Sequence, residues 1–183
     1  MNDALRHDGD AHTVRTSPSS VANMNYLLLK LVHIVAVVLF LGNITTGLFW
    51  KLRADRSRDP AIIAHTFAGI VRSDRWFTLP GVIVIIAAGI WAAILGGLPL
   101  LGTGWILWSI VLLSLSGLVF MARVVPLQAQ LAEMARRGAA SGEFDWPRYR
   151  TMSRAWELWG LLALLTPAAA VVLMVMKPVL PAL

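Results

Sequence analysis

One long stretch without a formal charge constrains the fold of this chain more than any other feature. It is Leu31–Trp50, LVHIVAVVLFLGNITTGLFW, and Lys30 and Lys51 bracket its twenty residues. A helix of that length rises about 30 Å, which is the thickness of the hydrocarbon core of a bilayer. The stretch is therefore predicted to be a transmembrane helix, with its histidine neutral.

The histidine, the asparagine and one glycine of this stretch lie on one face. At intervals i, i+3, i+7, i+10 and i+14 stand His33, Ala36, Phe40, Asn43 and Gly47. This spacing places them on one side of a helix. We call these five residues the polar stripe. Because the rest of the helix is Leu, Val, Ile and Phe, the stripe is expected to face protein rather than lipid.

Three further apolar blocks repeat the pattern. Hydrophobic residues make up 57% of the 183 residues and charged residues only 14%, whereas soluble domains average about 45–50% and about 25%. The blocks predict an all-α, polytopic membrane protein built as a four-transmembrane-helix bundle. The expected spans are at about 26–50, 76–95, 105–125 and 156–176.

One membrane domain, residues 24–178, accounts for nearly the whole chain. Residues 1–23 are polar and without periodicity, so they are predicted to be a disordered tail, and 179–183 form a short C-terminal tail. Met24 opens the sequence directly at the first span, which makes it a candidate natural start.

The two longer connecting segments are basic. Segment 51–75 contains six Lys or Arg residues and segment 126–154 contains five, whereas loop 96–104 contains none. By the positive-inside rule, both basic segments are expected in the cytoplasm, with the N- and C-termini outside. The expected location is the bacterial cell (inner) membrane.

Each basic segment also contains a short amphipathic helix. Asp59 followed by Pro60 is a helix start, and apolar residues then recur at helical spacing. A second helix is expected over LQAQLAEMARRG, from Leu127 to its glycine stop at Gly138. Both are predicted to lie at the membrane surface. Pro126 is expected to end the third span.

Charge and cysteine content exclude several classes of protein. The net charge of +6 follows from the positive-inside rule, and without a basic helix or an aromatic platform we expect no nucleic-acid partner. The lipid bilayer is the expected partner, together with further copies of the chain or a membrane complex. The absence of cysteine excludes disulfides, iron–sulfur clusters and thiolate metal sites.

His33 is the sharpest candidate for chemistry, because ionisable residues inside spans are rare and usually have a partner or a function. One interpretation makes it an axial ligand of haem b. The other makes it a neutral histidine hydrogen-bonded across the bundle. Met174 and Met176 are weak candidates for a second ligand, since they lie at the same side of the membrane, whereas His65 is expected at the opposite side. No metal site is predicted.

Three further polar residues are expected to be structural. Asn43 is predicted to bond a neighbouring helix. Arg123 and Glu157 lie near the inner ends of the third and fourth spans, where an ion pair between them is the simplest expectation and Arg154 is the competitor.

No motif of a known catalytic class is present. The sequence lacks a Walker-A loop, G-x-G-x-x-G, G-x-S-x-G, H-E-x-x-H and a pair of carboxylates within the spans. This disfavours ATP hydrolysis, hydrolase chemistry and zinc proteolysis. Whether the protein is an enzyme stays open.

Three segments carry a resemblance to a known family. They are LLKLVHIVAVVLFLGNITTGLFW, RSDRWFTLPGVIVIIAAGIW and WELWGLLALLTPAAAVVLMVMKP. Together they resemble the bacterial predicted integral membrane proteins grouped as domain of unknown function 2269, over about residues 24–178. The resemblance implies a membrane protein without a settled activity.

The first span is also similar, more distantly, to that of copper-resistance D proteins and of the HemJ type of protoporphyrinogen oxidase. Both begin with a helix of the L-H-x-x-x-V/A-x-x-x-x-G kind. This resemblance implies that His33 is the haem ligand. The leading interpretation is an integral inner-membrane protein without a settled activity, a four-helix bundle in which His33 is the candidate ligand for haem b. The alternatives are a protoporphyrinogen-oxidising membrane enzyme and an accessory or transport subunit of a copper or respiratory system.

Overall fold

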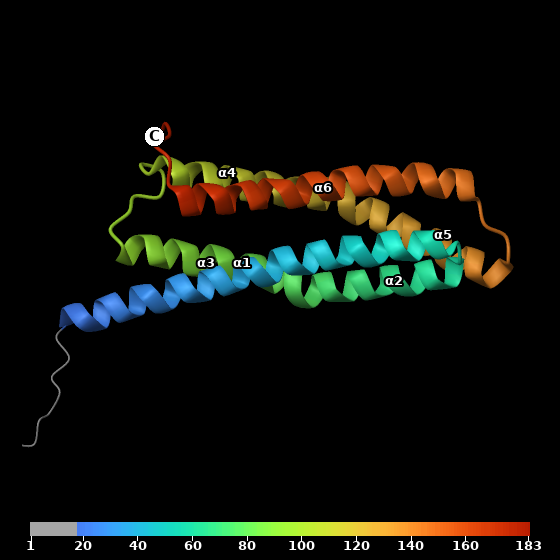
Figure 1. Ribbon diagram of the computed structural model, residues 1–183, viewed down its shortest axis with the longest axis horizontal. Coiled ribbons are helices and arrows are strands. Elements are labelled where there is room, and N and C mark those ends of the chain that lie inside the picture. The colour runs from blue at the N-terminus through green and yellow to red at the C-terminus, as the bar shows by residue number, and fades with distance from the viewer. Residues whose placement is uncertain (1–17) are drawn as a thin grey trace, which may run out of the picture.

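The computed structural model describes residues 18–183, with side chains from residue 23, and this part of the chain is helical apart from short connections. Four long helical rods lie side by side and run alternately up and down (Figure 1). The elements are α1 (Pro18–Ser57), α2 (Pro60–Ser73), the π-turn η1 (Asp74–Thr78), α3 (Leu79–Leu95), α4 (Gly104–Val119), the π-turn η2 (Phe120–Val124), α5 (Val125–Ser141) and α6 (Trp146–Met176).

Each rod is long and apolar enough to cross a membrane. The four candidate spans are Asn23–Ser57, Pro60–Leu95, Gly104–Ser141 and Trp146–Met176. The predicted all-α, four-span class is confirmed. The first rod starts earlier than expected, since α1 begins at Pro18, a residue suited to the first turn of a helix. Residues 18–23 are therefore helical rather than part of a tail, and the rest of the predicted tail, 1–17, lies outside the described residues.

The rods are longer than a bilayer requires. They contain 31 to 38 residues, whereas about 20 suffice to cross the hydrocarbon core. Most of the surplus lies at one end of the bundle, which we call the basic end: residues 51–73 and 125–155. Helix α1 also extends at the opposite end, before Leu31. The opposite end, which holds loop 96–103 and the C-terminus, is the loop end (Figure 1).

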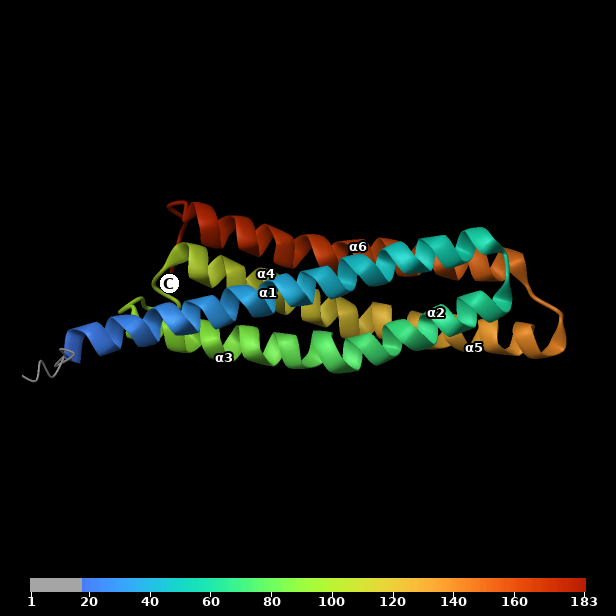
Figure 2. The same cartoon turned by 60° about the horizontal axis from the view of Figure 1, so that its bottom comes forward.

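The two amphipathic helices do not lie flat at a membrane surface, so that prediction is wrong. Helix α2 runs through η1 into α3, and α4 runs through η2 into α5, so both are continuous with the rods (Figure 2). The physical reason is that the apolar faces of α2 and α5 pack against each other. Ile63 and Phe67 of α2 are 0% and 1% exposed, and Leu131 and Ala135 of α5 are both 0% exposed in the same core. Protein covers these faces instead of lipid.

Two prolines explain the π-turns. Pro80 and Pro126 each stand as the second residue of the α-helix that follows a π-turn. Proline lacks the amide hydrogen of a regular helix and clashes with the carbonyl four residues before it. A π-turn widens the preceding turn and accommodates both defects. Pro126 therefore does not end the third rod as expected, and the helix continues through it to Ser141.

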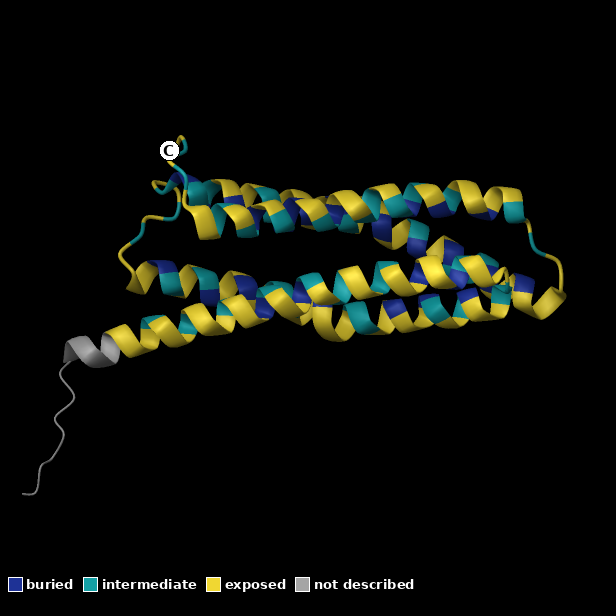
Figure 3. Ribbon diagram, in the orientation of Figure 1, coloured by how far each residue is buried: buried dark blue, intermediate teal, exposed yellow. Residues whose placement is uncertain are grey.

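Buried residues occur along all four rods (Figure 3), but they form core clusters of different size. At the basic end all four rods contribute to one core, made of Ala54, Ile63, Phe67, Ile70, Val119, Val124, Leu131, Ala135, Tyr149, Trp156 and Ala163. A smaller cluster, Ala36, Phe40 and Ile85, lies farther along α1 and α3. Beyond it the helices pair, α1 with α3 and α4 with α6, and within the described chain no Cα atom of α3 lies within 8 Å of α4 or α6.

Candidate functional site

His33 is fixed between two rods of one pair. Its Nδ1 lies 2.8 Å from the main-chain carbonyl oxygen of Ile85 on α3. The ring also lies against Gly89, where an added Cβ would stand 2.9 Å from Nδ1 and Cε1. The absence of a side chain at Gly89 therefore allows the imidazole to approach the backbone of α3.

The second ring nitrogen of His33 has a different environment. A carbonyl oxygen can only accept, so Nδ1 must carry the hydrogen when the ring is neutral, and Nε2 then carries the lone pair. No buried side-chain nitrogen or oxygen of the described chain lacks a partner, and no described residue bonds Nε2. Nε2 therefore reaches the surface of the bundle.

The candidate second ligands lie on other elements. Met174 is partly buried and Met176 is 72% exposed, both near the end of α6. That end of α6 stands apart from the start of α1 in both views (Figures 1 and 2). His65 is exposed on α2, at the basic end. In the described chain, His33 therefore contacts Ile85 and Gly89, and none of these candidate ligands lies beside it.

The polar stripe faces the neighbouring rod. Ala36 and Phe40 are 6% and 4% exposed, and the other three members are partly buried. Gly47 lies against the side chain of Ile70, because a Cβ added at this glycine would stand 3.8 Å from Ile70 Cγ1. The stripe thus runs along the contact of α1 with the second rod.

Asn43 is the centre of a polar cluster between rods. Its Nδ2 donates to Thr78 Oγ1 at 2.9 Å and lies 3.4 Å from Asp74 Oδ1. Thr78 donates to the same carboxylate at 2.9 Å, and Gln128 of α5 donates to its other oxygen at 3.2 Å. Trp156 Nε1 then donates to Gln128 Oε1 at 3.4 Å. One chain of hydrogen bonds therefore joins all four rods.

Asp74 and Gln128 are not among the residues that the sequence singles out. Both lie in predicted connecting segments, where polar residues need no special explanation. One sequence feature could have pointed to this contact. Asp74 and Thr78 are four residues apart, so they share a face if a helix continues through Pro80.

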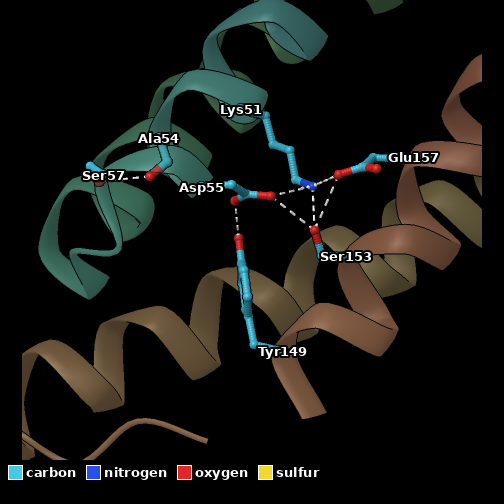
Figure 4. A network of polar contacts seen from close by, with 7 residues as sticks. All are labelled: Lys51, Ala54, Asp55, Ser57, Tyr149, Ser153 and Glu157. Atoms are coloured by element: carbon cyan, nitrogen blue, oxygen red, sulfur yellow. Dashed lines mark hydrogen bonds and ion pairs between the residues drawn. The ribbon is translucent and has the colours of Figure 1, made fainter. Parts of the chain in front are cut away.

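The most enclosed charge in the described chain lies at the basic end, on Lys51 (Figure 4). Its side chain is 1% exposed, and its Nζ forms ion pairs with Asp55 Oδ2 at 2.8 Å and with Glu157 Oε1. Nζ also donates to Ser153 Oγ and lies 5.4 Å from the ring centre of Trp156. We call Lys51, Asp55, Tyr149, Ser153 and Glu157 the lysine cluster.

The two carboxylates of the lysine cluster have further partners. Tyr149 donates its hydroxyl hydrogen to Asp55 Oδ1 at 2.6 Å. Ser153 Oγ lies 3.0 Å from Asp55 Oδ2 and 3.3 Å from Glu157 Oε1. A buried ion pair stabilises a structure only when its remaining hydrogen-bonding positions are filled. Lys51 Nζ has three polar partners and both oxygens of Asp55 are bonded, whereas Glu157 is 31% exposed at the edge of the cluster. The cluster fixes α1 to α6.

The expected ion pair between Arg123 and Glu157 is not formed. Glu157 pairs with Lys51, and the Arg123 guanidinium lies 5.4 Å from the ring centre of Trp159. The physical reason is that α1 continues as a helix to Ser57. Lys51 is therefore directed into the bundle, where it can reach Glu157, instead of lying in a loop.

Comparison with known proteins gives one match. The model of a family described as "Predicted integral membrane protein (DUF2269)" matches residues 27–178. No curated protein and no solved structure matches the chain.

Proposed function

The chain belongs to the DUF2269 family of predicted integral membrane proteins, and from this premise we propose that it binds haem b with His33 as an axial ligand. The observation that carries the proposal is the hydrogen bond between His33 Nδ1 and the carbonyl oxygen of Ile85, 2.8 Å long. Histidines that ligate metals usually donate their other ring hydrogen to a carbonyl or carboxylate, which fixes the tautomer and the orientation of the ring.

The residues around His33 fit one axial ligand. Nε2 is the nitrogen left with a lone pair, and it reaches the bundle surface. The nearest helix contributes Gly89, so no side chain crowds the ring from that direction. Bound haem would supply one-electron transfer, and the role of the chain is to hold the imidazole as a neutral donor. Met174 or Met176 as a second ligand stays a prediction.

An optical spectrum of the full chain, purified from cells supplied with haem precursor, tests this proposal. We expect a Soret band that His33→Ala abolishes. His65→Ala is the matched control, because His65 is exposed on α2 at the other end of the bundle, and this variant should keep the band. A well-folded, colourless protein, or a band of full intensity in His33→Ala, would contradict haem binding.

We propose the same membrane orientation that the basic segments favour. Residues 51–73 and 125–155 would then lie in the cytoplasm of a bacterium, below the inner membrane, and both termini outside. Alkaline phosphatase is active only outside the cytoplasm, so its fusion to the C-terminus should be active. A green fluorescent protein fusion at the same place should be dark. The opposite pair of results would reverse the orientation.

A further inference from the structure

Two adjoining cavities open at the basic end, between the end of α1 and the start of α6. Their volumes are about 190 Å³ and about 310 Å³. The smaller one borders the lysine cluster, and both are lined by Arg58, Trp146 and Arg150. Pro147 completes the larger cavity and Arg154 lines the smaller one. The two cavities thus share a wall of arginine and tryptophan.

The positive charge of this wall is only partly neutralised by its neighbours. Arg58, Arg150 and Arg154 are exposed, and no ion pair involves them within the described chain. Asp55 and Glu157 also line the smaller cavity and share the single cation of Lys51, so the three arginines and Lys51 exceed the two carboxylates by two positive charges. Three guanidinium groups around one small opening repel one another, and an anion in the opening would relieve that repulsion.

The backbone of Arg58 adds a second observation. Its φ is 52°, in the left-handed region that favours glycine. Glycine would adopt this turn more easily than arginine does. The turn leads the chain from α1 to α2 next to the cavity. The left-handed turn is thus occupied by an arginine that lines both cavities.

The wall that the two cavities share extends away from the expected bilayer, whereas the smaller cavity also borders Glu157 next to Trp156. Trp146 precedes Trp156 by ten residues of α6, which corresponds to about 15 Å along the helix axis. The headgroup layer is only about 5–8 Å thick on each side of the hydrocarbon core. If the hydrocarbon begins near Lys51 and Trp156, the shared wall reaches into the aqueous phase.

We propose that this arginine-lined cavity binds a soluble, phosphate-bearing small molecule. Arginine presents a planar fork of donors that matches the oxygens of a phosphate, and aromatic walls suit the remainder of such a ligand. Trp146 is held in place by Phe144 and Tyr149, at ring-centre distances of 4.4 Å and 6.0 Å. The site lies at the opposite end from His33 and does not depend on haem binding.

Isothermal titration of the full chain with inorganic phosphate and with pyrophosphate, in a detergent free of anionic lipid, tests the proposal. We expect saturable binding that weakens as salt is added. Arg150→Gln should lower the affinity about tenfold, the effect of one lost charge-assisted hydrogen bond. Arg148→Gln is the matched control, because Arg148 is exposed on the same helix but does not line either cavity.

The variant Arg58→Gly separates a loss of binding from a loss of folding. Glycine adopts the left-handed turn without strain, so this variant should melt no lower than the parent and still lose affinity. Equal affinities in Arg58→Gly, Arg150→Gln and Arg148→Gln, or no binding of either anion, would overturn the proposal. So would binding that appears only with phosphatidylglycerol vesicles and is lost in the two cavity variants, because the ligand would then be a lipid.

Discussion

The two ends of the bundle are held together in different ways. At the basic end, four rods share a continuous apolar core and the lysine cluster. At the loop end, the helices form two separate pairs. The bonds within those pairs are single polar contacts: His33 with the carbonyl of Ile85 in one pair, and Ser109 with the carbonyl of Ala170 in the other.

This difference follows from the surroundings expected for each end. Water drives apolar side chains together, so the part of the bundle outside the bilayer can condense around a core. Lipid chains are as apolar as leucine and provide no such drive, so helices in the bilayer associate through small residues and hydrogen bonds. The basic end should therefore be the stable part of the molecule, and the loop end the part where the helices separate more easily.

The largest expected effect is at the lysine cluster. Lys51→Met leaves Asp55 and Glu157 without their cation, and breaking a buried ion pair from one side costs about 3–5 kcal/mol. We expect the free energy of unfolding in detergent, measured by chemical denaturation, to fall by that order. Arg53→Met, at an exposed position of the same helix, should change it little. Equal losses in both variants would mean that the cluster does not stabilise the basic end.

A glycine in α5 gives the next largest effect. A Cβ at Gly138 would overlap the ring of Phe144, so Gly138→Ala must displace the aromatic group of Phe144, Trp146 and Tyr149. Overpacking of this kind costs about 1–3 kcal/mol. Gly69→Ala meets nothing within 4 Å and should instead stabilise α2 by up to about 1 kcal/mol. A melting temperature that falls in Gly138→Ala and rises in Gly69→Ala would support a tightly packed basic end.

At the loop end, Gly89→Ala tests the packing of His33. Its Cβ would lie 2.9 Å from the imidazole, so the ring must turn away from Ile85 and lose its hydrogen bond. A loss of about 1 kcal/mol is expected. Gly42→Ala, with open space around it, is the control. Histidine ring signals in NMR spectra should shift in Gly89→Ala only, and unchanged signals would contradict the packing.

The smallest expected effect is that of Ser116→Ala. Ser116 donates to the carbonyl oxygen of Ala163 at 2.6 Å, and hydrogen bonds between membrane helices contribute about 0.6 kcal/mol on average. Ser114→Ala, two residues away and exposed, should be neutral. A loss in Ser116→Ala as large as that in Lys51→Met would mean that one hydrogen bond between helices stabilises the bundle as much as the lysine cluster does.

The lysine cluster illustrates what local sequence patterns do not predict. Lys51 marks the end of the first apolar stretch, because its charge interrupts the run of uncharged residues. Whether its side chain lies in solvent or turns inward depends on how far α1 continues and on which helix stands opposite. Glu157 is 106 positions away along the chain, and no local pattern reports a contact of that separation.

The sequence by itself determined the class of this protein and the number of its spans. Apolar length, helical phase and the placement of Lys and Arg are local properties, and a bilayer selects on those properties directly. Only the tertiary structure decided that α2 and α5 continue the rods, that Glu157 pairs with Lys51, and that the helices separate into pairs at the loop end. Those features depend on which side chains pack or pair with each other across the bundle. Such contacts form between residues that are distant in the chain, so local sequence patterns do not specify them.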